Sequence, residues 1–508
     1  MNNQTLKSVF ILALSSVLGY FVSLYLTSYV TEKIGIEAYG FVSLAKTFAS
    51  YGNIITVALT SFMVRFISVH YHRGEVQESL SYYASSVGAS VALCALLSVV
   101  FIAIVLNLEY VIRIPDQLVK TVKILFFTVF VGFIATTLST PFSIGFYIKN
   151  RLDLSGVVKS LSYVFEAAAL IVLFKLFGAS LWFVGIGILT AAVTVLSGSA
   201  IFNRRLVPDL KYNRHYFSIS KVKTLLGNGM WNSVNQLGNT LNSGLDLLVS
   251  NALLSGVQTG QIAVAKNIGI MFATLAGIVF QPLQPELIRS YSNGTTEEFL
   301  DRLSKSMKFC GFFGSVAFAG FFALGNPFYQ LFLPSQNTNL LYVLTILTIF
   351  TYILDIFLQP IYYVSTLTVK NKIPCFVTIA GGLLNVAGMF LLIRYTSMGV
   401  YSVPVTTAVI MFAINMFFNP TYASMCLKIR RNYFYPLIVR HLLATAIMCL
   451  VFYVICIFIQ PAGWIGFLLT ALLLAALGTF VYAAFMLNKK EKTVMMCKFL
   501  GFLKIMKP

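Results

Sequence analysis

The chain is poor in charge. Only 10% of its 508 residues are Asp, Glu, Lys or Arg, whereas 58% are hydrophobic. Soluble domains carry roughly 25% charged residues, so the composition excludes a soluble protein and indicates a membrane protein with many spans. Acidic residues are scarcest, 16 against 36 Lys and Arg, which gives a net charge of +20. That excess does not indicate a nucleic-acid partner, because the basic residues lie in short loops between apolar runs.

Residues that form disulfides or hold metals are also few. The seven cysteines are scattered, mostly in or beside apolar runs, and predict neither a disulfide framework nor a metal site. The histidines, which fall in loops or at helix ends, are His70, His72, His215 and His441. We find no phosphate-binding glycine loop, nucleophile elbow, zinc-protease helix or acidic glycosyltransferase pair. Every loop is short, so we expect a transporter without a cofactor or metal, and not an enzyme.

Fourteen apolar runs are long enough to cross a bilayer, which takes roughly 20 helical residues. They lie near residues 8–30, 41–69, 82–108, 121–148, 157–177, 179–202, 224–251, 262–288, 304–333, 339–367, 373–394, 399–425, 438–460 and 463–487. The first run has no convincing cleavage site, so we expect a spanning helix and not a signal peptide. The prediction is an all-α integral membrane protein with 14 transmembrane helices.

The loops alternate in charge. Loops on one side, together with both ends of the chain, carry 28 basic residues, and loops on the other side carry six. Basic loops stay in the cytoplasm, so we expect both termini to be cytoplasmic. An odd number of spans would break this alternation.

The sequence repeats itself at a spacing of about 220 residues. Gly40–Lys46 reads GFVSLAK and Gly260–Lys266 reads GQIAVAK. Pro141 is echoed by Pro360, and Leu189–Asn203 by Val405–Asn419. One repeat holds six spans, so the two copies point the same way and predict a pseudo-two-fold axis along the membrane normal, with a cavity between two bundles.

This duplication divides the chain into predicted parts. We expect an N-terminal six-helix bundle over 1–203, a cytoplasmic linker over 204–223 and a C-terminal six-helix bundle over 224–425. Helices 13 and 14, over 438–487, lie outside the duplication. The basic cytoplasmic tail, 488–508, mixes lysines with apolar residues, which is typical of an amphipathic helix on an anionic inner leaflet.

Lys46 and Lys266 lie inside apolar runs at matching positions. A lysine in lipid costs about 2.5–3.5 kcal/mol on insertion scales, so it usually faces a cavity, a partner or a ligand. Counted from the glycine that opens each motif, both lie roughly 9 Å below the outer surface. From that depth the ammonium could instead snorkel to the headgroups. The matching positions favour a paired cationic site that clamps a diphosphate.

The seventh span carries a stripe of amides that ends in a carboxylate. Its members recur at steps of three and four and are Asn228, Asn232, Asn235, Asn239, Asn242 and Asp246. That spacing places them on one helical face. Amides can bond across packed helices, but six polar groups favour a wet cavity. Amides both donate and accept hydrogen bonds, which suits sugar hydroxyls.

Three carboxylates are candidates for ion coupling: Glu166, Asp246 and Asp355. Burial lets a carboxyl exchange protons near neutral pH, so these groups could couple transport to a proton or sodium gradient. The alternative is that each pairs with a lysine and only stabilises the fold.

Two stretches resemble a known family. Tyr29–Gly40 reads YVTEKIGIEAYG, and Gly244–Ser250 reads GLDLLVS with its aspartate near the outer end of the seventh span. With fourteen spans and a six-plus-six duplication, they are similar to Wzx-type polysaccharide flippases of the multidrug/oligosaccharidyl-lipid/polysaccharide (MOP) exporter superfamily. The resemblance covers essentially the whole chain.

The resemblance implies a function. The protein would move an undecaprenyl-diphosphate-linked oligosaccharide from the inner to the outer leaflet of the bacterial cytoplasmic membrane by alternating access. The product would serve the biosynthesis of a surface polysaccharide, such as O-antigen or capsule. Glycosyltransferases and a polysaccharide polymerase are the protein partners that the resemblance implies, beside the polyprenyl-diphosphate-linked glycan and membrane lipid.

Other functions stay open. A cation-coupled multidrug exporter of the same superfamily is one, although such exporters usually have twelve spans. A membrane enzyme or polymerase acting on the same lipid carrier is another, although a polymerase usually needs a large outer loop. The lipid II flippase also has fourteen spans, but its cavity is rich in arginine where this chain has Lys46 and Lys266.

Overall fold

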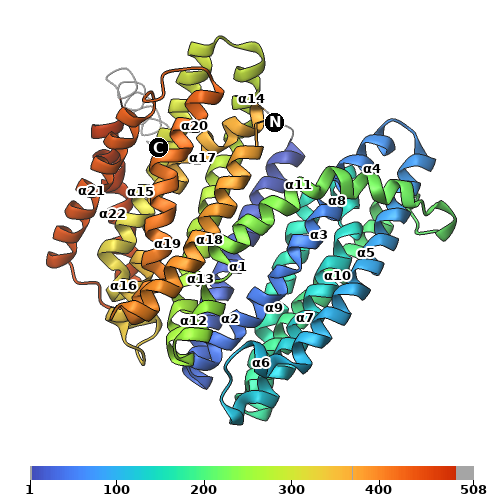
Figure 1. Ribbon diagram of the computed structural model, residues 1–508, viewed down its shortest axis with the longest axis horizontal. Coiled ribbons are helices and arrows are strands. Elements are labelled where there is room, and N and C mark those ends of the chain that lie inside the picture. Colours follow the sequence, from blue (N-terminus) through green and yellow to red (C-terminus); the bar gives the residue numbers. More distant parts are fainter. Residues whose placement is uncertain (1–2, 369, 488–508) are drawn as a thin grey trace, which may run out of the picture. The chain divides into compact units, whose positions relative to one another are not determined.

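The computed structural model describes residues 3–368 and 370–487, and these form an all-α protein (Figure 1). The predicted amphipathic tail, 488–508, lies outside the described residues. Contacts group the helices into two compact units. Unit 1 is the chain up to Ala263 together with Thr378–Val400, and unit 2 is Val264–Val377 together with the chain from Tyr401 onward. The predicted division into six-helix bundles at the linker 204–223 follows the repeat and stays a prediction.

Helices that are long and apolar enough to cross a membrane number 13 in the described part of the chain. The remaining predicted span, 224–251, is helical as well, but its amide stripe makes it too polar for that count. Each of the fourteen predicted spans therefore coincides with helix. The prediction of an all-α protein with many membrane spans is confirmed.

Unit 1 is built around α7 (Val119–Phe142) and α10 (Leu181–Leu206), which pack along each other (Figure 1). A glycine permits this approach: a Cβ at Gly185 of α10 would lie 2.0 Å from Thr128 Oγ1 of α7. Around this pair, α9 (Leu152–Phe177) packs against α10, α5 (Val76–Leu106) packs against α7, and α1 (Asn3–Ile34) packs against α9. The other elements here are α2 (Ile36–Tyr51), α3 (Asn53–Thr60), α4 (Met63–His72), α6 (Leu108–Val111), η1 (Asp116–Leu118), α8 (Ile144–Ile148), η2 (Arg214–Tyr216), α11 (Ile219–Ser243), α12 (Asp246–Leu253), the first part of α13 (Gly256–Phe280) and most of α18 (Lys372–Tyr395).

Unit 2 is built around the long helix α15 (Thr296–Phe332). It packs against α17 (Tyr352–Leu367) and against the C-terminal pair α21 (Tyr435–Phe458) and α22 (Gly463–Met486). The remaining elements are the rest of α13, η3 (Gln281–Leu283), α14 (Gln284–Asn293), α16 (Thr338–Ile349), η4 (Gly399–Tyr401, which begins in unit 1), α19 (Ser402–Ala413), the π-helix η5 (Ile414–Phe418) and α20 (Asn419–Cys426).

Several predicted spans are interrupted. The second, predicted as one run over 41–69, is divided into α2, α3 and α4, with the first break at Gly52. A Cβ at Gly52 would lie 2.7 Å from the ring of Phe133 on α7, so the glycine lets that ring press against the break. The tenth span is divided into α16 and α17 at Phe350 and Thr351. Periodicity alone does not reveal such breaks, because they depend on neighbouring helices.

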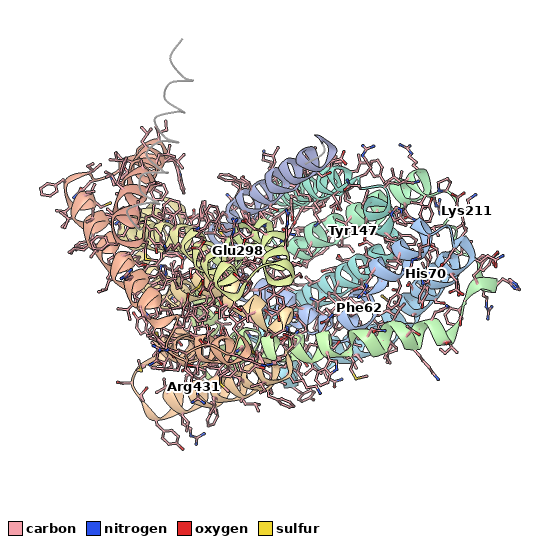
Figure 2. All side chains as sticks on the ribbon, turned by 90° about the horizontal axis from the view of Figure 1, so that it is seen from above. Phe62, His70, Tyr147, Lys211, Glu298 and Arg431 are labelled. Atoms are coloured by element: carbon pink, nitrogen blue, oxygen red, sulfur yellow. The ribbon has the colours of Figure 1, made fainter. Side chains whose placement is uncertain are left out.

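One end of unit 1 gathers basic loops; Figure 2 shows His70, Tyr147 and Lys211 there, end-on. The start of α11 is fixed to the start of α5 at this end. Ser218 N donates to Ser85 Oγ at 2.9 Å, and Ser85 Oγ donates back to Ser218 O at 3.2 Å. Lys221 pairs with Glu78, and the hydrogen bond between them raises the pKa of the lysine. The last part of the predicted linker is thus held against unit 1.

The histidines differ from expectation in one case. His70 pairs with Glu75 and stacks on Tyr82. His441, expected in a loop or at a helix end, is fully buried in the second turn of α21. Its Nε2 donates to Ile353 O at 3.0 Å, and its Nδ1 then accepts from Tyr482 Oη at 3.2 Å. His441 therefore joins the C-terminal helix pair to α17.

Candidate functional site

The glycines that open the two repeated motifs contact each other. A Cβ at Gly40 would lie 2.9 Å from Gly260 N and 3.0 Å from Gly260 Cα. A Cβ at Gly260 would collide with Ile36 O. The backbones of α2 and of the first turns of α13 are therefore in direct contact within unit 1, at equivalent points of the two copies. In the sequence, these glycines stand out only as part of the repeated motif.

Lys46 and Lys266 lie at the same position along their helices. Each comes ten residues after the first residue of its helix, Ile36 and Gly256, which is about 15 Å along the helix axis. The identical offset agrees with the duplication, and the depth of the lysines in the membrane stays a prediction. Lys46 is exposed and Lys266 is half-buried, each in its own unit.

The face of α2 that carries Lys46 is polar. Ser43 and Ser50 lie three residues before and four residues after it, and Asn53 follows one turn later at the start of α3. These spacings place the four side chains on one helical face. All four have exposed or half-buried side chains. A polar face of this kind is costly against lipid, so it favours a wet surface for Lys46.

Helix α11 presents three different faces. Gly229 packs against Ala58 of α3, where a Cβ would collide with the carbonyl oxygen of Ala58. A second face is exposed and apolar, with Leu226, Met230 and Leu237. The third face is exposed and polar and consists of Asn228, Asn232, Asn235 and Asn239. Asn228 Nδ2 donates to Thr224 O at 2.7 Å. A wet cavity beside these exposed amides stays a prediction.

The stripe ends where the seventh span is interrupted. Asn242 is buried near the end of α11, and Asp246 is buried at the first residue of α12. Tyr51 of α2 donates its hydroxyl to Gly244 O at 2.8 Å, between the two helices. Asn385 of α18, also buried, donates Nδ2 to Asn242 O at 2.7 Å. The break thus gathers a carboxylate, two amides and a phenol inside unit 1.

The other two candidate carboxylates lie elsewhere. Glu166 is half-buried on α9. It lies beside Gly187 of α10, because a Cβ placed on Gly187 would lie 3.7 Å from Glu166 Cγ. Asp355 is half-buried on α17 in unit 2. It accepts from Tyr362 Oη at 3.0 Å and from Gln359 Nε2 at 3.4 Å. Glu166 and Asp246 in unit 1, and Asp355 in unit 2, therefore have different surroundings, and their predicted role in ion coupling stays a prediction.

Unit 2 also contains an apolar cavity of about 260 Å³. It lies among α13, α15, α21 and α22, and its lining includes Phe272, Gly320, Phe328, Phe452 and Leu474. None of the lining residues carries a charge. Such a lining suits a hydrocarbon chain.

Several polar residues at these sites were missed from the sequence. Tyr51, Tyr362, Asn385 and Asn415 do not form a periodic stripe, and each acquires its role from a partner on another helix or several turns away. A weak signal existed for one of them, because Asn415 falls within the repeated segment Val405–Asn419. Among the described residues, no group of three or more His, Cys, Asp or Glu side chains could hold a metal.

Comparisons with known proteins agree with this architecture. No family model matches the chain. The chain is 27% identical over 486 residues to an uncharacterised membrane protein, EpsK of Bacillus subtilis (strain 168), and the match covers 95% of each chain. Among solved structures, it is similar to the lipid II flippase MurJ in an inward closed conformation, with a TM-score of 0.66 and 14% identity over 94% of this chain and all of that one.

A second solved structure extends the likeness. An inward-facing multidrug resistance transporter of the MATE family, in the MOP superfamily, aligns with a TM-score of 0.63 and 15% identity over 84% of this chain and 96% of that one. At these identities the likeness concerns the fold. The chain is a multi-pass integral membrane protein with the helical transporter fold of MurJ and the MATE proteins.

Proposed function

We propose that the protein is a flippase for a lipid-linked oligosaccharide. Its substrate is a polyprenyl-diphosphate-linked glycan, undecaprenyl being the expected lipid, which it moves from the inner to the outer leaflet of the bacterial cytoplasmic membrane by alternating access. Both termini lie in the cytoplasm. The glycan then serves the biosynthesis of a surface polysaccharide. The proposal agrees with the fold shared with a lipid II flippase, which is itself named for moving a lipid-linked substrate.

The observation that carries the proposal is the matched pair of lysines. Two lysines each come ten residues after the start of equivalent helices of the two copies, in a chain with few charges. A diphosphate carries the negative charge that such a pair neutralises, and charge-assisted hydrogen bonds are about twice as strong as neutral ones. Lys46 and Lys266 are therefore assigned to the diphosphate.

The remaining parts of the substrate match other surfaces. The exposed amides of α11, with Asn242 at its end, offer donors and acceptors to sugar hydroxyls. The apolar cavity beside α21 and α22 offers a hydrocarbon surface to the prenyl chain. One of Glu166, Asp246 and Asp355 couples the movement to an ion gradient.

A second candidate function is a cation-coupled multidrug exporter. The specific observation in its favour is the likeness to MATE transporters, whose TM-score is close to that of MurJ. In that case the carboxylates Glu166, Asp246 and Asp355 bind a cationic drug. The extra helices α21 and α22, beyond the usual twelve, have no role in that function.

The proposal is tested by neutralising the lysines. K46A/K266A should abolish delivery of the polysaccharide to the cell surface, because the diphosphate loses both counter-charges, whereas K46R/K266R should retain much of it. Surface polysaccharide and the amount of protein in the membrane are measured together in cells that lack the native gene. K120A serves as the matched control, since Lys120 is exposed at the start of α7.

Two outcomes would contradict this assignment. Normal export of polysaccharide by K46A/K266A would show that the two lysines are not needed to bind the diphosphate. Normal export combined with lost dye efflux favours the drug exporter instead.

A further inference from the structure

We propose that Asp355, Tyr362 and Asn415 form a proton-binding site whose state is relayed to the π-helix η5. The proposal rests on the proposed function in one respect: it identifies the proton as the ion that couples transport and Asp355 as its carrier. All three residues belong to unit 2. Tyr362 and Asn415 have not been assigned a role above.

The geometry centres on one hydroxyl group. Tyr362 Oη lies 3.0 Å from Asp355 Oδ1 and 2.9 Å from Asn415 Oδ1. A phenol has a single hydrogen to donate, so it can serve only one of these two acceptors at a time. The occupied acceptor must depend on whether Asp355 carries a proton.

Two arrangements follow from this count of hydrogens. When Asp355 is ionised, it accepts the Tyr362 hydrogen, because a charged acceptor forms the stronger bond. When Asp355 takes a proton from water, the new O–H donates to Tyr362 Oη, and Tyr362 then donates to Asn415 Oδ1. No atom moves far; the chain of hydrogen bonds reverses its direction.

The receiving end of this chain is an irregular helix. Asn415 lies in the π-helix η5, between α19 and α20. Single π-turns inside α-helices occur frequently at functional sites. Asn419 Nδ2 donates to Asn415 Oδ1 at 3.0 Å, while the buried Asn415 Nδ2 has no hydrogen-bond partner in the structure. An amide left half-satisfied is unstable in a buried place, so the π-turn is poised to rearrange when Tyr362 releases it.

Among the described residues, Asp355 has no ion-pair partner. Helices α14 and α15 bring Glu286 and Arg302, which pair with each other, Asp301 and Lys305, which also pair, and the cations Arg289 and Lys308. Helix α20 brings Tyr422, which donates to Lys370 O, and α21 brings His441, which donates to Ile353 O. The polar partners of Asp355 in the described part of the chain are Tyr362 and Gln359. Asp355 is half-buried.

The test measures hydrogen exchange of the backbone at 414–418 in the purified protein, in lipid nanodiscs without substrate, at acidic and alkaline pH. Rates are corrected for the intrinsic effect of pH. Exchange in the wild type should be slower at acidic pH by about fivefold, the factor expected for one hydrogen bond. D355N cannot ionise and Y362F cannot relay, so both should lose this dependence on pH.

Two controls keep the result interpretable. Y342F removes a phenol of α16 that donates to Phe322 O on α15, away from η5, and it should behave as the wild type. Thermal unfolding of each variant shows whether it is folded, and circular dichroism of D355N and Y362F should match the wild type.

Three results would overturn the proposal: exchange at 414–418 that ignores pH in the wild type, full pH dependence in Y362F, or a response to sodium at constant pH in place of a response to protons. Because no substrate is present, none of these results depends on whether the protein carries a lipid-linked glycan. The flippase proposal can therefore fail in the lysine experiment while this one stands, and the reverse also holds.

Discussion

Single residues decide how closely the helices of unit 1 approach. Gly40 and Gly260 have no side chain between them, and Gly260 is also pressed against the carbonyl oxygen of Ile36. Adding even a methyl group to such a contact forces backbones apart, and overpacking typically costs about 1–3 kcal/mol. The glycine that precedes each lysine by six residues thus fixes the place from which that lysine is presented.

A substitution at this contact should be costly. G260A is expected to lower the temperature of thermal unfolding in detergent by several degrees, since its Cβ meets backbone and not a movable side chain. Gly277, on the same helix α13, has open space around its built Cβ, so G277A should leave the temperature unchanged or raise it slightly. Equal stability of G260A and G277A would contradict the close contact.

At the scale of the helix, α11 separates apolar and polar exposure on different faces. The apolar side chains on one face are as exposed as the amides on another; they are Leu226, Met230 and Leu237. Only the amides can form hydrogen bonds with water. The packed face with Gly229 lies against α3. This division is what we expect of a helix that borders lipid on one side and a water-filled cavity on another.

Accessibility of single cysteines distinguishes these faces. In a background without the seven native cysteines, N232C and N235C should react with a membrane-impermeant thiol reagent in inside-out or right-side-out vesicles. M230C and L237C, exposed on the apolar face, should react at least tenfold more slowly, because lipid protects their thiols. If the two amide-face cysteines and the two apolar-face cysteines are labelled at the same rate, the amides of α11 do not line a water-filled cavity.

The helices could be predicted from the sequence, whereas the breaks within them could not. The apolar runs and their lengths predict the helices, because the length of a span is set by the bilayer. The interruptions at Gly52, at Ser243–Leu245 and at Phe350–Thr351 were not predicted, since each depends on a partner such as Phe133 or Tyr51 from another helix. Asp355 was found by its charge, but Tyr362 was not, because a hydrogen bond seven residues away leaves no trace in periodicity.

The whole molecule is oriented by its loops. The structure places the basic loops around His70, Tyr147 and Lys211 at one end of unit 1 (Figure 2). A different loop carries Arg113, whose backbone exchanges hydrogen bonds with Asn251 of α12 at 2.9 and 3.2 Å. The excess of basic residues predicts that the first set is cytoplasmic.

Labelling of intact cells checks this orientation. In the same cysteine-free background, D116C should react with an impermeant thiol reagent added from outside, and K211C should react only after the membrane is opened. Both native side chains are exposed, so burial cannot account for a difference. The opposite labelling pattern would show that the protein has the opposite orientation in the membrane and that the proposed direction of transport is wrong.

The contact between Gly40 and Gly260 bears on the origin of the chain. In a two-fold arrangement, a residue meets its own counterpart only where the axis passes. A half-length ancestor that assembled as a homodimer would have used the same glycine on both sides of that interface. Fusion of two gene copies would then have turned an intermolecular contact into an internal one.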